Sequence, residues 1–204
     1  PNLVIRDMYG LCYLKVRVGL YYYDDESEIR NPTLEYVRLQ NVSGFGSGYE
    51  FGYFDSNRVF VPLGSTETTF VNVSTDKNVV TEAGTIGCYH IRLNGSYGTF
   101  AEAAAAASGY EGGFPAFYKD KYYVLVGSYT SAINALEAKT TLGLSGFVYS
   151  ASNRCIVVSS AADNRILFEF DCGEEKNFVL RPIGTGEKPQ TWLRYYKYHG
   201  DFEF

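Results

Sequence analysis

The sequence contains an internal repeat, and this repeat restricts the possible folds more than any other feature of the chain. The segments Tyr89–Ser108 and Lys121–Leu144 each run from alternating apolar residues through Gly-Ser-Tyr into a stretch with several alanines. Alternation is typical of a half-buried strand and alanine favours helix, so each copy predicts a strand followed by a helix. Two copies are too few for a solenoid, which needs at least ~3 repeats. The repeat therefore predicts two units that close on each other in one domain.

Local signals mark where the elements of this domain begin and end. Thr99 and Glu102 have the spacing of a capping box, which predicts that the first helix begins at Thr99. The second helix is expected from about Ser131 to Leu142, where Gly143 ends it. The strands expected around the helices are Tyr89–Leu93, Pro115–Lys119, Lys121–Val126 and Gly146–Tyr149. The order βαββαβ predicts a ferredoxin-like domain of the α+β class over residues 84–160.

The segments on either side of this domain, residues 1–83 and 161–204, are expected to be rich in β-structure. In the first, short alternating runs are separated by Gly, Asn, Ser and Asp, which favour turns. Its expected strands include Leu34–Leu39, Tyr49–Phe54, Arg58–Pro62 and Thr69–Val73. The whole chain is thus predicted to be a ferredoxin-like domain flanked by β-rich segments.

The composition is that of a folded protein, and its charge argues against several classes of partner. Apolar residues make up 46% and charged residues 20% of the chain, which are ordinary globular values. The formal net charge is -5, so the chain has no overall positive field to attract nucleic acid or anionic lipid. No run approaches the ~20 apolar residues that span a bilayer. Because the chain begins with Pro1 rather than Met, we expect that a signal or anchor has been removed.

The cysteines and histidines form no recognisable motif. The four cysteines, Cys12, Cys88, Cys155 and Cys172, include no CxxC pair, so the sequence does not support a zinc site or another metal or cofactor site. We interpret them as buried free thiols and expect no disulfide between Cys88 and Cys155. The two histidines have no motif that links them to a nucleophile, so they do not indicate catalysis.

The alternation also assigns the two faces of the predicted sheet. One face, with Ile91, Leu93, Val124 and Val126, is expected to contact the helices. The helix residues expected in this contact are Phe100, Ala103, Ala104, Ala107, Ile133, Leu136 and Leu142. The opposite face carries His90, Arg92, Tyr123 and Leu125. This outer face is free for a ligand or partner if helices cover only one side, or is covered by the neighbouring β-segments, which would explain the apolar Leu125.

Both copies of the repeat resemble halves of a known bacterial domain. YHIRLNGSYGTFAEAAAAA, from Tyr89, resembles the first half of a sporulation-related repeat (SPOR) domain. YYVLVGSYTSAINALEAKTTLG, from Tyr122, resembles the second half. The resemblance implies the βαββαβ fold and binding to bacterial peptidoglycan, with a preference for glycan strands stripped of their stem peptides.

The flanking segments resemble a second family, the stage II sporulation protein D family. KVRVGLYYY, from Lys15, resembles the opening of that family, and RYYKYHGDFEF, from Arg194, resembles the strand that begins its catalytic core. Its members are secreted proteins of Gram-positive spore formers that cleave denuded glycan as lytic transglycosylases. The resemblance implies an extracytoplasmic protein that is secreted or associated with the cell wall.

The second resemblance also implies that the catalytic segment is absent from this chain. In the family the catalytic glutamate lies downstream of this strand, which would place it after Phe204. Glycan cleavage needs a carboxylic acid that protonates the glycosidic oxygen. We interpret the nearby glutamates, which stand in no such motif, as solvated charges: Glu169, Glu174, Glu175, Glu187 and Glu203. The chain is therefore expected to contain no catalytic residue and to be the N-terminal part of a longer enzyme.

The predicted glycan site lies on the outer face of the sheet. It consists of Arg92, Tyr123 and Leu125, with Ser96 and Ser128 at the strand ends. Arginine supplies fixed hydrogen-bond donors, tyrosine supplies a ring face with a polar tip, and the hydroxyls can reach sugar oxygens.

Three functions from different classes remain open at this stage. The leading one is a non-catalytic module that binds peptidoglycan glycan strands. A second is a protein assembly module of the cell envelope or spore, whose partners are other envelope or sporulation proteins. The third is an enzyme that cleaves glycan itself, which would need a glutamate with a raised pKa in a cleft.

Overall fold

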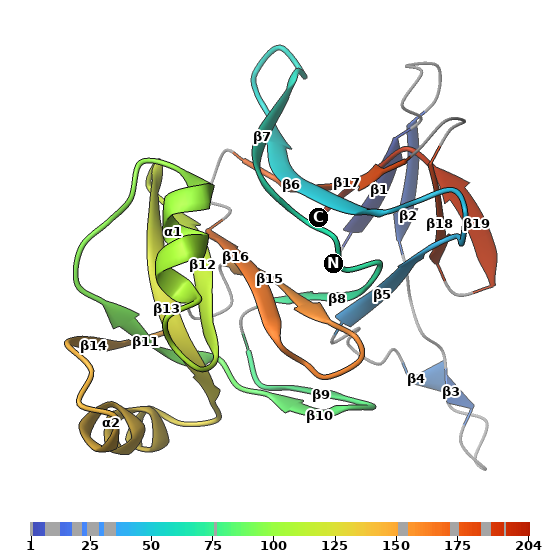
Figure 1. The fold of residues 1–204 in the computed structure, drawn as a ribbon. Coiled ribbons are helices and arrows are strands. Elements are labelled where there is room, and N and C mark those ends of the chain that lie inside the picture. Colours follow the sequence, from blue (N-terminus) through green and yellow to red (C-terminus); the bar gives the residue numbers. More distant parts are fainter. Residues whose placement is uncertain are drawn as a thin grey trace.

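The computed structural model describes residues 36–75, 77–150, 155–171, 176–184, 189–193 and 195–204, together with the strand backbone of 2–6, 13–17, 22–23 and 29–30. Most of these residues lie in β-strands, and two α-helices accompany them (Figure 1). The strands form two large sheets and two short hairpins. The predicted α+β class is confirmed.

The repeat forms elements in the predicted order. They are β11 (Tyr89–Leu93), α1 (Phe100–Ala107), β12 (Gly113–Tyr118), β13 (Lys121–Tyr129), α2 (Ala132–Thr141) and β14 (Gly146–Tyr149). The capping box is confirmed, because Thr99 Oγ1 accepts a hydrogen bond from Glu102 N at 3.2 Å and Glu102 Oε2 accepts one from Thr99 N at 3.0 Å. The four strands lie in the order β14-β11-β13-β12, and each neighbouring pair is antiparallel.

These four strands form one end of a ten-stranded sheet. β12 pairs in parallel with β16 (Ile166–Asp171), which joins the repeat to the rest of the sheet. The sheet continues through β15 (Cys155–Ser160), β8 (Phe70–Thr75), β5 (Tyr36–Asn41), β18 (Gln190–Leu193) and β19 (Tyr196–His199). Strands from both flanking segments thus extend the sheet of the repeat, and the proposed boundaries after residues 83 and 160 stay a prediction.

The second large sheet has six strands in the order β2-β1-β20-β17-β6-β7. They are β2 (Tyr13–Arg17), β1 (Asn2–Arg6), β20 (Asp201–Glu203), β17 (Phe178–Ile183), β6 (Gly48–Phe54) and β7 (Phe60–Thr66). β1 pairs with β20, so strands from the two ends of the chain lie side by side. The four strands predicted between residues 34 and 73 correspond to β5, β6, β7 and β8.

The main core lies between the two large sheets and is rich in aromatic rings. Phe51 of β6 stacks on Phe168 of β16 with ring centroids 4.9 Å apart and an interplanar angle of 3°. Phe100 of α1 meets Phe168 edge-on at 5.8 Å, and Phe178 of β17 lies beside both stacked rings. Aromatic pairs of this kind add to the hydrophobic stabilisation of a core. The abundant phenylalanines of the sequence are therefore used mainly to join the sheets.

Neighbouring β-structure covers part of the face that is opposite the helices. The hairpin of β9 (Val79–Thr81) and β10 (Gly84–Ile86) lies below β15 and β8 in Figure 1. Its Ile86 packs with Phe114 and Leu125, and Leu125 is fully buried. The sequence left open whether this face is free or covered by neighbouring β-segments. Around Leu125 it is covered.

In the contact between sheet and helices, the predicted sheet residues are confirmed, whereas the residues predicted for α2 are wrong. Ile91, Val124 and Val126 pack against Ala107 as expected. The prediction is wrong for three large side chains, which are exposed by 69%, 54% and 57%: Ile133, Leu136 and Leu142. The residue of α2 that is fully buried is Ala135. α2 contacts the sheet through small side chains, which allow the helix to lie close, and so the large ones point elsewhere.

The predicted burial of the cysteines is confirmed for Cys155 and is wrong for Cys88. No disulfide joins Cys88 and Cys155, as predicted. Cys155 is buried and Cys88 is half-buried, whereas Cys12 and Cys172 lie outside the described residues. In the described part of the chain, neither helix has the length and apolarity that a membrane span requires.

Candidate functional site

Arg92 forms the centre of a small surface on the outer face of the ten-stranded sheet. It lies on β11, where it pairs with Leu125 of β13 on one side and with Phe147 of β14 on the other. Residues directly opposite each other in an antiparallel pair point to the same face of the sheet. The β-register thus places Phe147 beside Arg92, and we call Arg92, Tyr123 and Phe147 the arginine-aromatic surface.

The guanidinium of Arg92 is held by aromatic rings. Its Cζ lies 3.6 Å from the centroid of the Tyr123 ring, 5.3 Å from that of Phe147 and 5.9 Å from that of Tyr118. A guanidinium this close to aromatic rings is attracted by their quadrupoles, and the effect is larger where water is partly excluded. Arg92 and Tyr123 are half-buried, and Phe147 is 47% exposed. The side chains are therefore ordered by one another and still reach the surface.

The hydrogen-bond donors of Arg92 are not used within the described part of the chain. The Nε atom is buried without a hydrogen-bond partner. No ion pair or hydrogen bond from this guanidinium to a described residue is present, in contrast to Arg58 and Arg181, which each hold a carboxylate. The terminal N–H groups of a fixed guanidinium are suited to bind oxygen atoms of a ligand, whereas the buried Nε cannot reach one.

A buried polar cluster, Tyr118, Glu169 and His90, lies on the same face of the sheet. Tyr118 donates a hydrogen bond of 2.5 Å to Glu169 Oε1, and His90 Nε2 lies 3.2 Å from Glu169 Oε2. His90 Nδ1 lies 2.8 Å from the carbonyl oxygen of Gly127, which can only accept, so Nδ1 carries a proton. Burial, followed by the charge of Glu169, raises the pKa of Tyr118 well above its usual value. Tyr118 therefore stays protonated and donates to the carboxylate.

The position of Glu169 corrects the sequence interpretation. Glu169 was expected to be a solvated charge, but its side chain and that of His90 are completely buried. The reason is the parallel pairing of β12 with β16, which sets Glu169 opposite Ala116 on the outer face. This cluster is inaccessible to a large ligand, so we assign it a structural role beneath the arginine-aromatic surface.

The structure brings together two of the five predicted glycan contacts. Arg92 and Tyr123 are in contact. Leu125 is fully buried and packs in the core, so its assignment as a contact residue was wrong. The hydroxyl of Ser128 accepts a hydrogen bond from Gly87 N at 2.7 Å and donates one to Gly87 O at 3.0 Å, so it holds the chain before β11.

The two serines lie near opposite ends of β11. Tyr89 pairs with Tyr129, which puts Ser128 beside the start of β11. Ser96 is exposed and follows the end of β11. A single contact surface on the outer face therefore does not include both hydroxyls, although the Gly-Ser-Tyr repeat suggested equivalent roles.

Phe147 is the member of this surface that the sequence reasoning did not assign. The signal was present, because Gly146–Tyr149 was predicted as the closing strand of the repeat. What was missing was the register, since only the pairing of Arg92 with Phe147 shows that the two share a face. An exposed aromatic residue on an edge strand is a common feature of contact surfaces.

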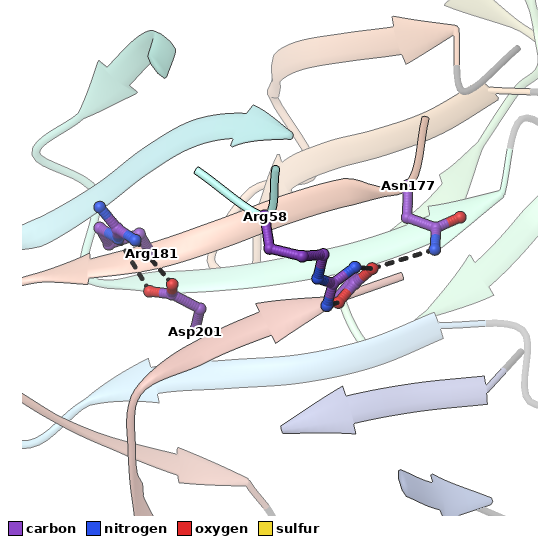
Figure 2. A network of polar contacts seen from close by, with 5 residues as sticks. Arg58, Asn177, Arg181 and Asp201 are labelled. Atoms are coloured by element: carbon purple, nitrogen blue, oxygen red, sulfur yellow. Dashed lines mark hydrogen bonds and ion pairs between the residues drawn. The ribbon is translucent and has the colours of Figure 1, made fainter. Parts of the chain in front are cut away.

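A second polar network lies on the six-stranded sheet and holds its C-terminal strand (Figure 2). Arg58 donates to both oxygens of Glu203, at 3.2 Å and 2.9 Å, and Asn177 donates to Oε1 at 3.0 Å. Arg181 holds Asp201 in the same bidentate manner at 2.9 Å and 2.8 Å. Bidentate pairs of this kind combine charge with fixed geometry. The network therefore attaches β20 to its neighbours.

Glu203 also corrects the sequence interpretation, because it was expected to be solvated and its side chain is almost fully buried. Proton donation to a glycosidic oxygen needs a protonated carboxyl group that faces the substrate. The oxygens of Glu203 instead accept from Arg58 and Asn177, so this residue is structural. Glu174, Glu175 and Glu187 lie outside the described residues.

Within the described residues, histidine, cysteine, aspartate and glutamate form no group of three or more that could hold a metal ion. Comparisons of the chain with protein-family models, with curated proteins and with solved structures found no match. The arginine-aromatic surface and its chemistry therefore provide the basis for the proposed function.

Proposed function

We propose that the chain is a non-catalytic region of a cell-wall protein that binds glycan strands of peptidoglycan through Arg92, Tyr123 and Phe147. The observation that carries this proposal is the ordered guanidinium between two aromatic rings, with its N–H groups unused by described residues. Sugars present apolar C–H faces and hydroxyl oxygens to a protein. The rings offer a flat apolar contact for the former, and the guanidinium offers donors for the latter.

The fold supports the proposal at the level of topology. We interpret the four strands β14, β11, β13 and β12 with α1 and α2 as a ferredoxin-like, SPOR-like unit. The strand order supports this interpretation, as do the two helices, which connect β11 to β12 and β13 to β14. In this interpretation the outer sheet face is the one that meets glycan. The location that follows is extracytoplasmic, either secreted or associated with the cell wall, as part of a protein related to lytic transglycosylases.

A pull-down with purified peptidoglycan sacculi, with and without stem peptides, tests the proposal. The double variant Arg92→Ala/Tyr123→Ala should bind sacculi at least roughly tenfold more weakly, since a hydrogen bond that involves a charged group such as the guanidinium contributes about 1.5 to 3 kcal/mol. Binding should be stronger to stripped glycan. Because the sugar chain offers mostly neutral groups, added salt should change binding only weakly.

The matched control is Arg165→Ala/Tyr195→Ala, which removes the same two residue types from exposed positions elsewhere. It should bind sacculi as the wild type does. Equal binding by the Arg92→Ala/Tyr123→Ala variant and the wild type would refute the assigned surface. Circular dichroism of each variant establishes that the fold is retained.

A second candidate function is a protein assembly module, and the burial of Leu125 and His90 favours it, because it leaves only the margin of the outer face accessible. A chain of this kind would be retained by other envelope or spore proteins rather than by glycan. Wild-type chain that fails to bind either form of sacculus would favour this function over glycan binding.

A further inference from the structure

A row of polar side chains crosses three neighbouring strands on the outer face of the ten-stranded sheet. Asn72 of β8 lies opposite Arg38 of β5 and opposite Ser159 of β15, and residues in register share a face. Asn72 is fully buried and Ser159 is nearly so. Both polar atoms of the Asn72 side chain, Ser159 Oγ and Arg38 Nε are buried without a hydrogen-bond partner among the described residues. Such burial costs free energy and therefore indicates a role for this row.

The tip of the β9–β10 hairpin lies over the row. Glu82, in the turn of the hairpin, contacts Arg38 with 3.0 Å between Oε1 and Nη1. On the other side, Thr81 donates a hydrogen bond of 2.8 Å to Oδ1 of Asn164, in the turn between β15 and β16. β8 lies between β5 and β15, so these two contacts span it and the hairpin tip covers Asn72. Figure 1 shows the hairpin beside β15 and β8.

The contact between Glu82 and Arg38 is weak and incomplete. The Glu82 side chain is 77% exposed, and exposed ion pairs contribute little to stability. Arg181 holds Asp201 through Nε and Nη2 together. Arg38 instead contacts Glu82 through Nη1, and its Nε has no partner in the described chain. A carboxylate that met both N–H groups of Arg38 would bind in the stronger bidentate mode.

The base of the hairpin is held separately from its tip. Asn78 donates a hydrogen bond of 2.9 Å to the carbonyl oxygen of Thr130 and accepts one of 3.1 Å from Cys88 N. Ile86 at the end of β10 packs in a buried apolar cluster. The tip can therefore lift about this base when another group replaces Glu82.

We propose that the hairpin tip is a lid over a binding site for the C-terminal residue of a peptide. The ligand carboxylate replaces Glu82 on Arg38, and the lifted tip uncovers Asn72. Glu82 points to a carboxylate, because this is the group that Arg38 holds in the closed protein. The amide of Asn72 has a donor and an acceptor, which complement the C=O and N–H of a peptide group, and Ser159 supplies a hydroxyl. The proposal is independent of glycan binding, since none of these residues belongs to the arginine-aromatic surface.

An NMR titration with N-acetylglycine, a small molecule that carries both the carboxylate and the peptide group, tests the proposal. We expect a dissociation constant on the order of 1 mM, as is usual for so small a ligand. N-acetylglycinamide, which lacks the carboxylate, should bind at least roughly tenfold more weakly. Hydrogen exchange locates the site: amides of residues 79–86 should exchange faster in saturating N-acetylglycine, whereas those of Tyr36–Asn41 should not.

The variant Glu82→Gln distinguishes a ligand site from a purely structural row. It removes the carboxylate that occupies Arg38, so it should tighten the binding of N-acetylglycine by about two- to fivefold, the contribution of an exposed ion pair. The matched control Glu111→Gln makes the same change at another exposed position and should bind as the wild type does. Arg38→Gln should weaken binding at least roughly tenfold, with circular dichroism to establish that the fold is retained.

Four results would each overturn the proposal: no binding of N-acetylglycine by the wild type, equal binding of N-acetylglycinamide, unchanged exchange of residues 79–86, or a Glu82→Gln variant that binds no more tightly than the wild type. The last of these does not depend on a variant that endangers the fold, because the Glu82 side chain is exposed.

Discussion

Glu169 shows how one buried carboxylate organises its neighbours. One oxygen of its carboxyl group accepts a hydrogen bond from the hydroxyl of Tyr118, and the other faces His90. All three side chains are buried. A buried charge is tolerated only when it is paired and hydrogen-bonded. Removing one member of the cluster should therefore lower the free energy of unfolding, because the remaining side chains would be buried without their hydrogen-bond partner.

The variant Glu169→Leu should test this at the level of stability. Leucine keeps a similar volume and removes both acceptors, so we expect a loss of about 3 to 5 kcal/mol in the free energy of unfolding. The measurement is urea denaturation followed by circular dichroism. The comparison variant Tyr118→Phe removes a single hydroxyl and should cost only about 1 to 3 kcal/mol. A Glu169→Leu protein as stable as the wild type would contradict the assigned role.

The hairpin between β12 and β13 turns through two residues in an unfavourable conformation. Lys119 and Asp120 have φ angles of 46° and 59°, the left-handed pair that a two-residue hairpin requires. Asn and Gly are preferred there, whereas a lysine is strained in this region. Asp120 gains in return an ion pair with Lys176 at 2.9 Å. The strain therefore lies mainly at Lys119.

Replacing Lys119 by Asn should stabilise the protein by about 0.5 to 1 kcal/mol, because asparagine adopts the left-handed region more readily. Thermal or urea denaturation measures the gain. The control Lys121→Asn makes the same chemical change in the adjoining strand, where asparagine is unfavourable, and should not stabilise. A Lys119→Asn protein of unchanged or lower stability would show that the turn is not strained.

The elements of the repeat could be predicted because their signals are local. The capping residues Thr99 and Glu102 and the alternation in Tyr89–Leu93 lie within a few residues of the elements they define. The orientation of α2 could not be predicted in the same way. Ile133 and Leu136 are three residues apart and share one side of the helix, so periodicity favours that side as the contact, whereas the buried residue is the small Ala135.

The whole molecule contains pairings that no local pattern reveals. The parallel contact of β12 with β16 joins residues far apart in sequence and sets Glu169 opposite Ala116, where its side chain is buried. The pairing of Arg92 with Phe147 likewise depends on the register of β14. That Arg92 and Tyr123 share a face could be predicted from alternation, whereas the burial of Leu125 depends on contacts with residues such as Ile86 of the β9–β10 hairpin.

The buried tyrosines predict that the molecule as a whole loses stability at alkaline pH. Burial raises the pKa of Tyr49 and Tyr149, and it raises the pKa of Tyr122 to about 12. Burial and then the charge of Glu169 raise the pKa of Tyr118 well above its usual value. In the unfolded chain tyrosine has a pKa of 10.0. Above that value the unfolded chain loses protons that the folded protein keeps, so unfolding becomes more favourable as the pH rises.

The stabilisation from these tyrosines should therefore be complete below about pH 10 and should decrease as the pH rises toward their folded pKa values. Each fully buried tyrosine contributes a slope of about 1.4 kcal/mol per pH unit in this range. Urea denaturation at several pH values between about 9 and 11 measures how the free energy of unfolding changes with pH for all titrating groups together. Lysines also titrate there, so the comparison that isolates one group is Tyr118→Phe, whose slope should be smaller by roughly the share of one tyrosine. Identical pH slopes for the variant and the wild type would mean that Tyr118 ionises equally readily in both states, contrary to its burial against Glu169.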